Sequence, residues 1–319
     1  MLCILLKNPN PYFCLAAEEY LLKKFDAEIF LLWQSYDTVV VGKHQCAMGE
    51  INYPFVRKND ITVARRISGG GTVFHDAGNV NFSFIKNVDS PSEISFKKFT
   101  APVVESLAKL NVTAVNSGRN DLLVEGKKIS GNAEHIFKNR VLHHGTLLFN
   151  SDLENLGQAI KAIPGKYETK AVPSKRSVVA NITEFLQYKM SPDEFISFLL
   201  KNELQNPENK FYELNENDIQ NINDLVEEKF TTWDWNFGYS PKYNFQNEFH
   251  FEGKRFLVEL QVEKGRIIQS NCSGDILSAQ KMKILNESLS GVRHFYSDIR
   301  EKLEKIRPEI SDELVFGFF

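Results

Sequence analysis

Apolar residues follow two different periods along the first part of the chain. They recur at helical spacing over residues 12–25, which predicts a helix with Glu18 and Glu19 on its outward face. A second full helix is predicted over residues 95–110. Short apolar or alternating runs bounded by turn residues predict strands. The predicted strands cover residues 2–6, 29–33, 38–41, 61–66, 80–85, 112–115, 121–125, 128–137 and 141–149.

The pattern changes near residue 240. Before it, residues 191–204 and 215–230 have helical periods, and Pro192 stands in the first turn of the former, where proline is favoured. After it, alternating residues 248–267 predict an antiparallel meander, followed by helices over 278–289 and 296–306. The length of 319 residues favours about two domains. We therefore predict one domain over residues 1–240 and a small α+β domain over residues 243–319.

The chemically distinctive stretch is residues 65–81, which read RRISGGGTVFHDAGNVN. It contains three consecutive glycines, Gly69, Gly70 and Gly71, which is more than one tight turn requires. Glycine has no side chain, so a ligand can approach the backbone closely. Consecutive backbone N–H groups can form an anion-binding nest, and a guanidinium group can grip phosphate or carboxylate. The alternative is a glycine-rich hairpin with solvated arginines. The flanking Arg65, Arg66 and the His-Asp-x-Gly-Asn sequence favour a cradle for nucleotide phosphate or acyl phosphate.

Charge and cysteine usage narrow the class of protein. A net charge of −3 and a pI near 6.2 give no global basic field, so no nucleic-acid partner is expected. The four cysteines are scattered without a Cys-x-x-Cys pair, which indicates reduced thiols in the cytoplasm. The first residues lack the basic lead and cleavage site of a signal peptide. No apolar stretch approaches the roughly 20 residues that cross a bilayer, so no membrane partner is expected.

Residues 65–79 resemble the signature loop of the lipoate–protein ligase A family, in the biotin/lipoate A/B protein ligase superfamily. Residues 126–133, GKKISGNA, resemble the family's Lys-x-Ser-Gly-x-Ala. Residues 143–148, HHGTLL, resemble its strand motif His-His-Gly-Thr-Leu-Leu. Residues 176–182, RSVVANI, are similar to its Arg-Ser-x-Val-x-Asn-Leu segment. The resemblance extends over nearly the whole chain, including the predicted C-terminal domain.

This resemblance implies an α+β protein with the biotin/lipoate-ligase catalytic fold, whose mixed sheets are related to class II aminoacyl-tRNA synthetases. A small α+β accessory domain would follow. The implied function is ATP-dependent ligation of lipoate to protein, with ATP and Mg²⁺ as cofactors and lipoyl-AMP as intermediate. The implied partners are apo lipoyl domains of 2-oxoacid dehydrogenases or the glycine-cleavage H protein. By sequence pattern alone, only a mixed α/β or α+β protein with two domains is supported.

Lys128 is the predicted catalytic residue. Activation of a carboxylate by ATP needs a positive charge that offsets the repulsion between carboxylate and α-phosphate. An ammonium on a flexible stem can contact both groups, and Gly126 and Gly131 leave room for a ligand beside it. A solvated pair with Lys127 in a hairpin is the alternative. The Ser-Gly-x-Ala context and the resemblance favour Lys128 over Lys127.

The resemblance also implies a set of residues that bind the nucleotide and lipoyl-AMP. They are Arg66, Gly70, Gly71, Thr72, Val73, Phe74, Asn79, Asp121, Lys128, Ala133 and His144. Asp121 is in addition a candidate Mg²⁺ ligand, because Mg²⁺ prefers hard oxygen donors; a turn or capping role is the alternative for Asp121 and Asn79. Strand alternation places Arg65 opposite Arg66 and predicts a structural role for Arg65.

The remaining candidates have structural alternatives. His143 and His144 should point to opposite faces of one strand, and His144 is the better ligand candidate. His75 and Asp76 are expected to orient the glycine loop rather than to catalyse. An acyl tail needs a narrow apolar slot, for which the candidates are Trp33, Val40 and Phe82.

One loop departs from the family pattern. Residues 42–48 read GKHQCAM where the family reads Gly-Arg-x-Gln-Asn-Pro-Trp, so the acyl-tail preference stays open. Cys46 in this loop raises an alternative function, a cysteine-dependent octanoyl or lipoyl transferase. A lipoyltransferase that uses only preformed lipoyl-AMP is the other alternative. A non-catalytic lipoate-binding or nucleotide-binding protein is disfavoured by the glycine loop and Lys128.

Overall fold

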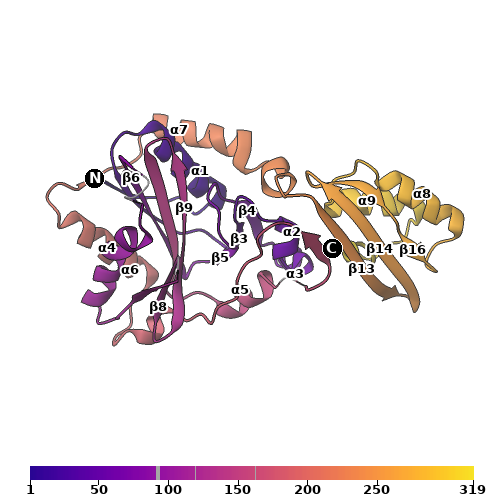
Figure 1. Ribbon diagram of the computed structural model, residues 1–319, viewed down its shortest axis with the longest axis horizontal. Coiled ribbons are helices and arrows are strands. Elements are labelled where there is room, and N and C mark those ends of the chain that lie inside the picture. The colour runs from indigo at the N-terminus through magenta and orange to yellow at the C-terminus, as the bar shows by residue number, and fades with distance from the viewer. Residues whose placement is uncertain (91–93, 119, 162) are drawn as a thin grey trace. The chain divides into compact units, whose positions relative to one another are not determined.

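The computed structural model describes residues 1–90, 94–118, 120–161 and 163–319 (Figure 1). The chain forms two compact units, and neither is continuous in sequence. The first unit contains residues 1–43, 62–157 and 174–232; the second contains residues 44–61, 158–173 and 233–319. Residues 44–61 and 158–173 thus pack with the C-terminal residues. Whether the predicted domains, residues 1–240 and 243–319, fold independently stays a prediction.

A mixed sheet of eight strands is the centre of the first unit. In spatial order its strands are β12 (Lys210–Phe211), β1 (Leu2–Leu5), β2 (Ile29–Trp33), β6 (Asn79–Asn87), β10 (Arg140–Leu148), β9 (Lys127–Phe137), β8 (Asp121–Val124) and β7 (Val115–Ser117). Strand β1 runs parallel to both of its neighbours, and the other pairs are antiparallel. Most of these strands match the sequence prediction within a few residues. The strand predicted over residues 112–115 starts and ends earlier in the chain than β7 does.

The two faces of this sheet differ because side chains alternate along each strand. On β6, Val80, Phe82 and Phe84 point into the main hydrophobic core, which also receives apolar residues of α4 (Phe96–Lys109) and α6 (Pro192–Leu204). We call this the core face. The opposite face carries the intervening polar residues of β6, and we call it the polar face.

Helix α1 (Pro11–Lys24) packs against β6 and β10 on one side and against α7 (Glu216–Leu225) and η3 (Val226–Phe230) on the other (Figure 1). The helix itself was predicted correctly, but its outward glutamates were not. Glu18 and Glu19 are both buried, with exposed fractions of 0% and 3%. The carboxylate of Glu18 accepts a hydrogen bond from Ser83 on β6. The carboxylate of Glu19 forms ion pairs with Lys23 and with Lys229 of η3. A helix covered on two sides has no fully solvated face for them.

A small sheet delivers the glycine-rich loop. Its strands are β4 (Thr62–Arg65), β3 (Thr38–Val41) and β5 (Val73–His75), with β3 in the centre, parallel to β4 and antiparallel to β5. The glycines connect the outer strands β4 and β5. Both ends of the loop are therefore fixed by pairing to the same strand.

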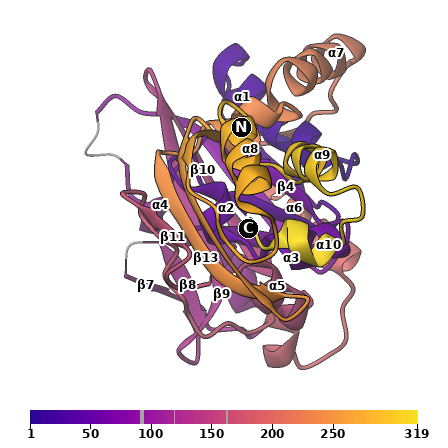
Figure 2. The same ribbon diagram turned by 90° about the vertical axis from the view of Figure 1, so that its right-hand side faces the viewer.

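The second unit is built on an antiparallel sheet of five strands. These are β11 (Tyr167–Thr169), β13 (Tyr243–Phe251), β14 (Lys254–Glu263), β15 (Arg266–Ser270) and β16 (Ser273–Gly274). Its helices are α2 (Ala47–Glu50), α3 (Tyr53–Lys58), η4 (Asp234–Gly238), α8 (Ala279–Leu289), α9 (Tyr296–Ile306) and α10 (Asp312–Phe316), of which α8 and α9 lie side by side (Figure 2). The predicted meander and the helices over 278–289 and 296–306 are present.

Five elements of the second unit were missed, and β16 and η4 are two of them. Strand β11 lies in the connection after residue 163 and pairs with β13, while α2 lies in the loop after Val41 and α10 follows α9. In the first unit, η2 (Ile182–Phe185) is a short 3-10 turn, and α5 (Leu153–Ala159) spans the division between the units. The helical pattern of residues 152–162 in the sequence predicts a longer helix than α5; its last residue, Ala162, lies outside the described residues. Within the described ranges, no helix combines the length and apolar character needed to span a membrane.

Candidate active site

The guanidinium of Arg66 holds the glycine loop. Its Nη2 donates to the carbonyl oxygens of Gly69 at 2.6 Å and Gly71 at 2.7 Å, while Nη1 donates to Val40 at 3.1 Å and Nε to the hydroxyl of Ser68 at 3.0 Å. Burial lowers the pKa of Arg66 to about 10, although the charge of Glu18 acts in the opposite direction. Contact of Arg66 with phosphate remains a prediction, since these hydrogen bonds all lie within the loop and its supporting strand.

Arg65 has the structural contacts that alternation predicted. Its side chain is fully buried, and Nη1 donates to the carbonyl oxygens of Gly42 at 2.9 Å and Lys43 at 3.1 Å. The backbone N–H of Lys43 in turn donates to the carbonyl of Ser68. The end of β3 and the start of the glycine loop are thus tied together.

The loop lies over the polar face of the large sheet. A Cβ atom on Gly70, which has φ of +88°, would be 3.6 Å from the Cβ of Ala133 on β9. Ala133 is the cross-strand partner of His144 on β10, whose Nε2 is 2.6 Å from Oγ of Ser68. The fold therefore brings Arg66, Gly70, Ala133 and His144 together, as the resemblance implied.

Asn79 and Asp121 project from the same face. Asn79 is two residues from Asn81 on β6, and its Nδ2 donates to Oδ1 of Asn81 at 2.9 Å. Asp121 is the cross-strand partner of Gly131, which is two residues before Ala133 on β9. Residues two apart on a strand, and direct cross-strand partners, share a face. A function in ligand binding remains a prediction for both, and Asn79 is fully buried.

Lys128 lies at the start of β9 with its side chain about a quarter exposed. Its Nζ is 2.8 Å from Oδ1 of Asp121. A Cβ on Gly131 would be 3.0 Å from both Cε and Nζ of Lys128, which places the ammonium on the polar face. The backbone of Lys128 is fixed as well, because it bonds to Val178 and Ala180. The ammonium of Lys128 is therefore held by a paired strand, next to the backbone of Gly131.

Lys127 has different surroundings. Its Nζ is 3.6 Å from Oε2 of Glu184, and both side chains are nearly half exposed. Exposed pairs of this kind contribute little to stability. The two neighbouring lysines thus have different partners, Glu184 for Lys127 and Asp121 for Lys128.

His75 and Asp76 hold the end of the glycine loop in place. Asp76 accepts the N–H of Gly78 at 2.9 Å and of Asp152 at 2.6 Å. His75 is buried beside Trp33 and 3.4 Å from the hydroxyl of Ser35. Burial lowers the pKa of His75 to about 3, and the charge of Arg66 acts in the same direction, so the ring is neutral at physiological pH. These contacts fit the predicted orienting role.

The paired histidines do point to opposite faces of β10. His143 lies on the core face, where it stacks on Phe99 with the ring planes 2° apart. Its Nδ1 is 3.0 Å from Glu134. His144 lies on the polar face against Ser68 and Glu18.

The three candidates for an acyl slot do not share a face. Trp33 is the cross-strand partner of Asn81 and lies on the polar face, whereas Phe82 lies in the core cluster. Phe82 is therefore removed from the candidates by its position on β6. Trp33 and Val40 are both buried, with exposed fractions of 2% and 1%.

Sequence reasoning missed three contributors from the segment after residue 173. Oγ of Ser174 accepts the N–H of Thr72 at 2.8 Å and lies 3.1 Å from the position of a Cβ on Gly71. Val178 and Ala180 pair with Lys128, as described above. The segment was recognised by its resemblance, but no periodicity indicates where it folds back.

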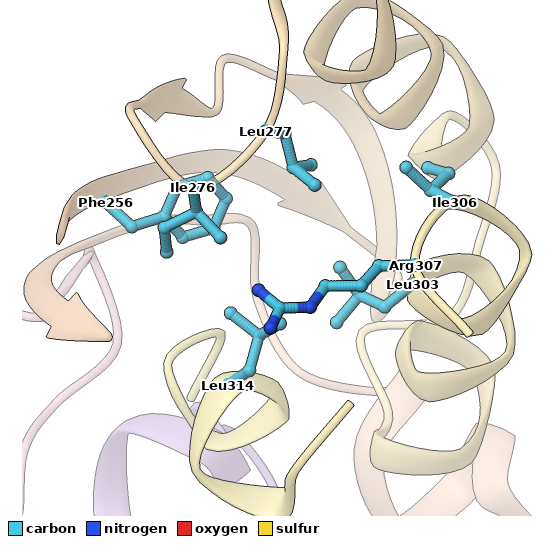
Figure 3. A pocket seen from close by; sticks show the side chains of 7 residues that line it. All are labelled: Phe256, Ile276, Leu277, Leu303, Ile306, Arg307 and Leu314. Carbon is cyan, nitrogen blue, oxygen red and sulfur yellow. The ribbon is translucent and has the colours of Figure 1, made fainter. Parts of the chain in front are cut away.

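Among the described residues, no group of three or more His, Cys, Asp and Glu side chains is arranged for a metal ion. A pocket in the second unit is apolar except for Arg307 (Figure 3), which pairs with Glu252. Its other lining residues are Phe256, Ile276, Leu277, Leu303, Ile306 and Leu314.

Comparisons with known proteins agree with this geometry. Residues 10–203 match the family model of the lipoyl protein ligase A/B catalytic domain, and residues 240–314 match that of the bacterial lipoate protein ligase C-terminus. The chain is 41% identical over 298 residues to lipoate–protein ligase 1 of Staphylococcus aureus, covering 93% of this chain and 91% of that protein.

Solved structures show the same similarity. A lipoate–protein ligase A with bound ATP is 29% identical with a TM-score of 0.64, covering 74% of this chain and 98% of that one. A bi-partite lipoate protein ligase of Thermoplasma acidophilum, solved in a study with its E2 lipoyl domain, is also 29% identical with a TM-score of 0.64. It covers 74% of this chain and 96% of its own.

The predicted family, fold class and enzyme class are confirmed by these matches, because they extend over both parts of the chain and include the residues of the polar face. The chain belongs to the lipoyl protein ligase A/B family and is a lipoate–protein ligase with the bacterial C-terminal domain.

Proposed function

We propose that this chain activates lipoate with ATP to give lipoyl-AMP and pyrophosphate, and then transfers the lipoyl group to a lysine of an acceptor protein. The observation that carries this proposal is the position of Lys128. Its ammonium lies beside Asp121 and over Gly131, on the sheet face that the glycine loop covers. A positive charge and an exposed backbone are what a carboxylate and a phosphate need in order to approach each other.

In the first step the lipoate carboxylate attacks the α-phosphorus of ATP, and pyrophosphate leaves with the bonding electrons. Lys128 would neutralise charge on the carboxylate and the phosphoryl oxygens. In the second step the acceptor's ε-amine attacks the acyl carbon of lipoyl-AMP, an amide forms and AMP leaves. Lys128 would then stabilise the oxyanion of that addition.

The nucleotide and lipoyl-AMP are assigned to residues of the loop and the polar face. The proposed set is Arg66, Gly70, Gly71, Thr72, Val73, Phe74, Asn79, Asp121, Lys128, Ala133 and His144. Phe74 has a fully buried side chain, so only its backbone would contact the ligand. Asp121 would hold Mg²⁺, which supplies neutralising charge to the phosphates and usually needs only one or two protein carboxylates.

The proposed acceptors are apo lipoyl domains of 2-oxoacid dehydrogenases or the glycine-cleavage H protein. The E2 lipoyl domain studied with the Thermoplasma acidophilum ligase supports the first of these. The proposed place of action is the cytoplasm, which the four scattered cysteines without a Cys-x-x-Cys pair support.

The direct experiment supplies free lipoate, MgATP and an apo lipoyl domain, and measures the mass of the acceptor. We expect the addition of one lipoyl group and release of pyrophosphate. Product from added lipoyl-AMP, without product from lipoate and ATP, would instead identify a lipoyltransferase. Product that requires an acyl-carrier donor would contradict the ligase reaction.

Cys46 tests the cysteine-dependent alternative. The thiol is buried in the second unit, at the start of α2 and near Tyr167 and Tyr243. A nucleophilic cysteine needs a stabilised thiolate, usually next to a positive charge. We expect Cys46→Ser to keep at least about half of the ligation rate. Loss of activity together with a trapped acyl group on Cys46 would overturn this prediction.

Gly131 tests the position of the Lys128 ammonium. A methyl group at residue 131 would be 3.0 Å from Cε and Nζ of Lys128 and would push the ammonium away. We expect Gly131→Ala to lower the rate of pyrophosphate release by about tenfold to hundredfold, since small displacements of a catalytic group are costly. The thermal midpoint should change little. An unchanged rate in the folded variant would show that Lys128 acts from another position.

A further inference from the structure

A continuous hydrogen-bonded chain leads from helix α1 to the glycine loop. The carboxylate of Glu18 is 2.9 Å and 3.0 Å from Nδ1 of His144. Nε2 of His144 is 2.6 Å from Oγ of Ser68, and Ser68 accepts the Nε–H of Arg66 at 3.0 Å. These four residues are more than nine-tenths buried. They come from α1, β10 and the segment after β4, which only the tertiary fold brings together.

The proton positions along this chain are determined by what each group can donate. An ionised carboxylate only accepts, so Nδ1 of His144 carries a proton that points to Glu18. Glu18 also accepts the hydroxyl of Ser83 at 2.6 Å. Ser68 accepts from Arg66, and its hydroxyl proton donates to Nε2 of His144 when that nitrogen carries no proton.

Arg66 extends the chain into the loop itself. The same guanidinium that donates to Ser68 also donates to the carbonyl oxygens of Gly69 and Gly71. The charge of Glu18 helps to keep this buried guanidinium ionised, opposing the effect of burial on its pKa. A carboxylate on α1 thereby supports the backbone of the loop without touching it.

A second histidine–glutamate pair provides an internal comparison. Nδ1 of His143 is 3.0 Å from Glu134, a distance like that between His144 and Glu18. However, His143 stacks between aromatic rings on the core face, and its Nε2 faces the side chain of Asn132 at 3.3 Å. This pair has the same chemistry without a connection to the glycine loop. It shows which effects come from a histidine–carboxylate hydrogen bond in general.

We propose that Glu18 is a positioning residue for adenylate formation, which acts through His144 and Ser68 to hold the backbone of residues 69–71 in the geometry that binds the nucleotide. This inference rests on the ligase reaction proposed above. It concerns one residue, Glu18, that the sequence placed on the outward face of a helix.

The test is a double-mutant cycle that measures pyrophosphate release as a function of ATP concentration. Glu18→Gln keeps the shape of the side chain and removes its charge. We expect it to lower kcat/KM for ATP by about tenfold to hundredfold, while the KM for the acceptor domain changes less than about twofold. If Glu18 acts through Ser68, then adding Glu18→Gln to Ser68→Ala should lower kcat/KM by less than about threefold further.

Glu134→Gln is the matched control, and it should change kcat/KM for ATP by less than about twofold, alone or combined with Ser68→Ala. A downfield proton resonance of the His144 ring, lost in Glu18→Gln and kept in Glu134→Gln, would show that the hydrogen bond exists in solution. If Glu18→Gln does not fold, His144→Gln takes its place in the cycle.

Two results would overturn the proposal. Equal losses in Glu18→Gln and Glu134→Gln would show a general effect of removing a carboxylate that bonds to a histidine. Multiplicative losses in Glu18→Gln and Ser68→Ala would show that they act independently. If the wild-type chain releases no pyrophosphate from lipoate and ATP, the proposed function fails first; binding of lipoyl-AMP, measured on the same variants, then tests the loop geometry by itself.

Discussion

Replacing Lys128 with alanine is expected to lower the rate of pyrophosphate release by about a hundredfold to a thousandfold. This is the range found when one group that stabilises a transition-state charge is removed. The variant should still fold, since the Lys128 side chain is about a quarter exposed and its backbone bonds to Val178 and Ala180 do not involve the side chain. Single-turnover release of pyrophosphate, with circular dichroism as a check of folding, measures the effect.

Lys127→Ala is the matched control, because Lys127 is the adjacent residue and pairs with the exposed Glu184. It should keep most of the rate. Lys128→Arg is expected to restore little, since a planar guanidinium does not replace a compact ammonium next to Asp121 and Gly131. Similar losses in the two alanine variants would mean that the catalytic lysine has been assigned to the wrong position.

Gly78→Ala is expected to reduce the free energy of unfolding by about 3 kcal/mol or more. A Cβ at residue 78 would lie 1.9 Å from the carbonyl oxygen of Asn150, whose N–H donates to the carbonyl of Gly78. The clash involves backbone on both sides, so no side-chain rotation relieves it. Denaturant unfolding of the purified variant measures the loss.

Gly157→Ala is the control for this effect. Gly157 lies in α5, and a Cβ there meets no atom within 4 Å. Alanine is favoured over glycine in a helix, so this variant should match the wild type or gain up to about 1 kcal/mol. Equal stability of the two variants would show that the hairpin after Asp76 can move away from Asn150.

The sequence by itself determined most of the longer elements of this protein and most of the residues that carry its chemistry. Helical and alternating periods identified α1, α4, β2, β3 and β6, because one face of each element packs against apolar groups and the pattern records this. Local signals also separated Arg65 from Arg66 and His143 from His144, since alternation along a strand depends only on neighbouring residues. The glycine loop and Lys128 were recognised from their motifs.

The tertiary structure decided which of these groups meet. Glu18 looked like a solvated residue on a helix surface, but α1 is covered on two sides and brings its carboxylate to His144. Phe82 looked like a lining residue of an acyl slot, but the register of β6 with β2 turns it toward the core. Ser174 reaches Thr72 from about a hundred residues away in sequence.

The physical reason is the range of the interactions. Periodicity reports burial of one element against its surroundings, whereas a hydrogen-bonded chain such as Glu18–His144–Ser68 depends on three segments at once. The polar groups in it must find partners because burial without a hydrogen bond is costly. Which partners they find depends on sheet register and helix packing, and these are properties of the folded chain.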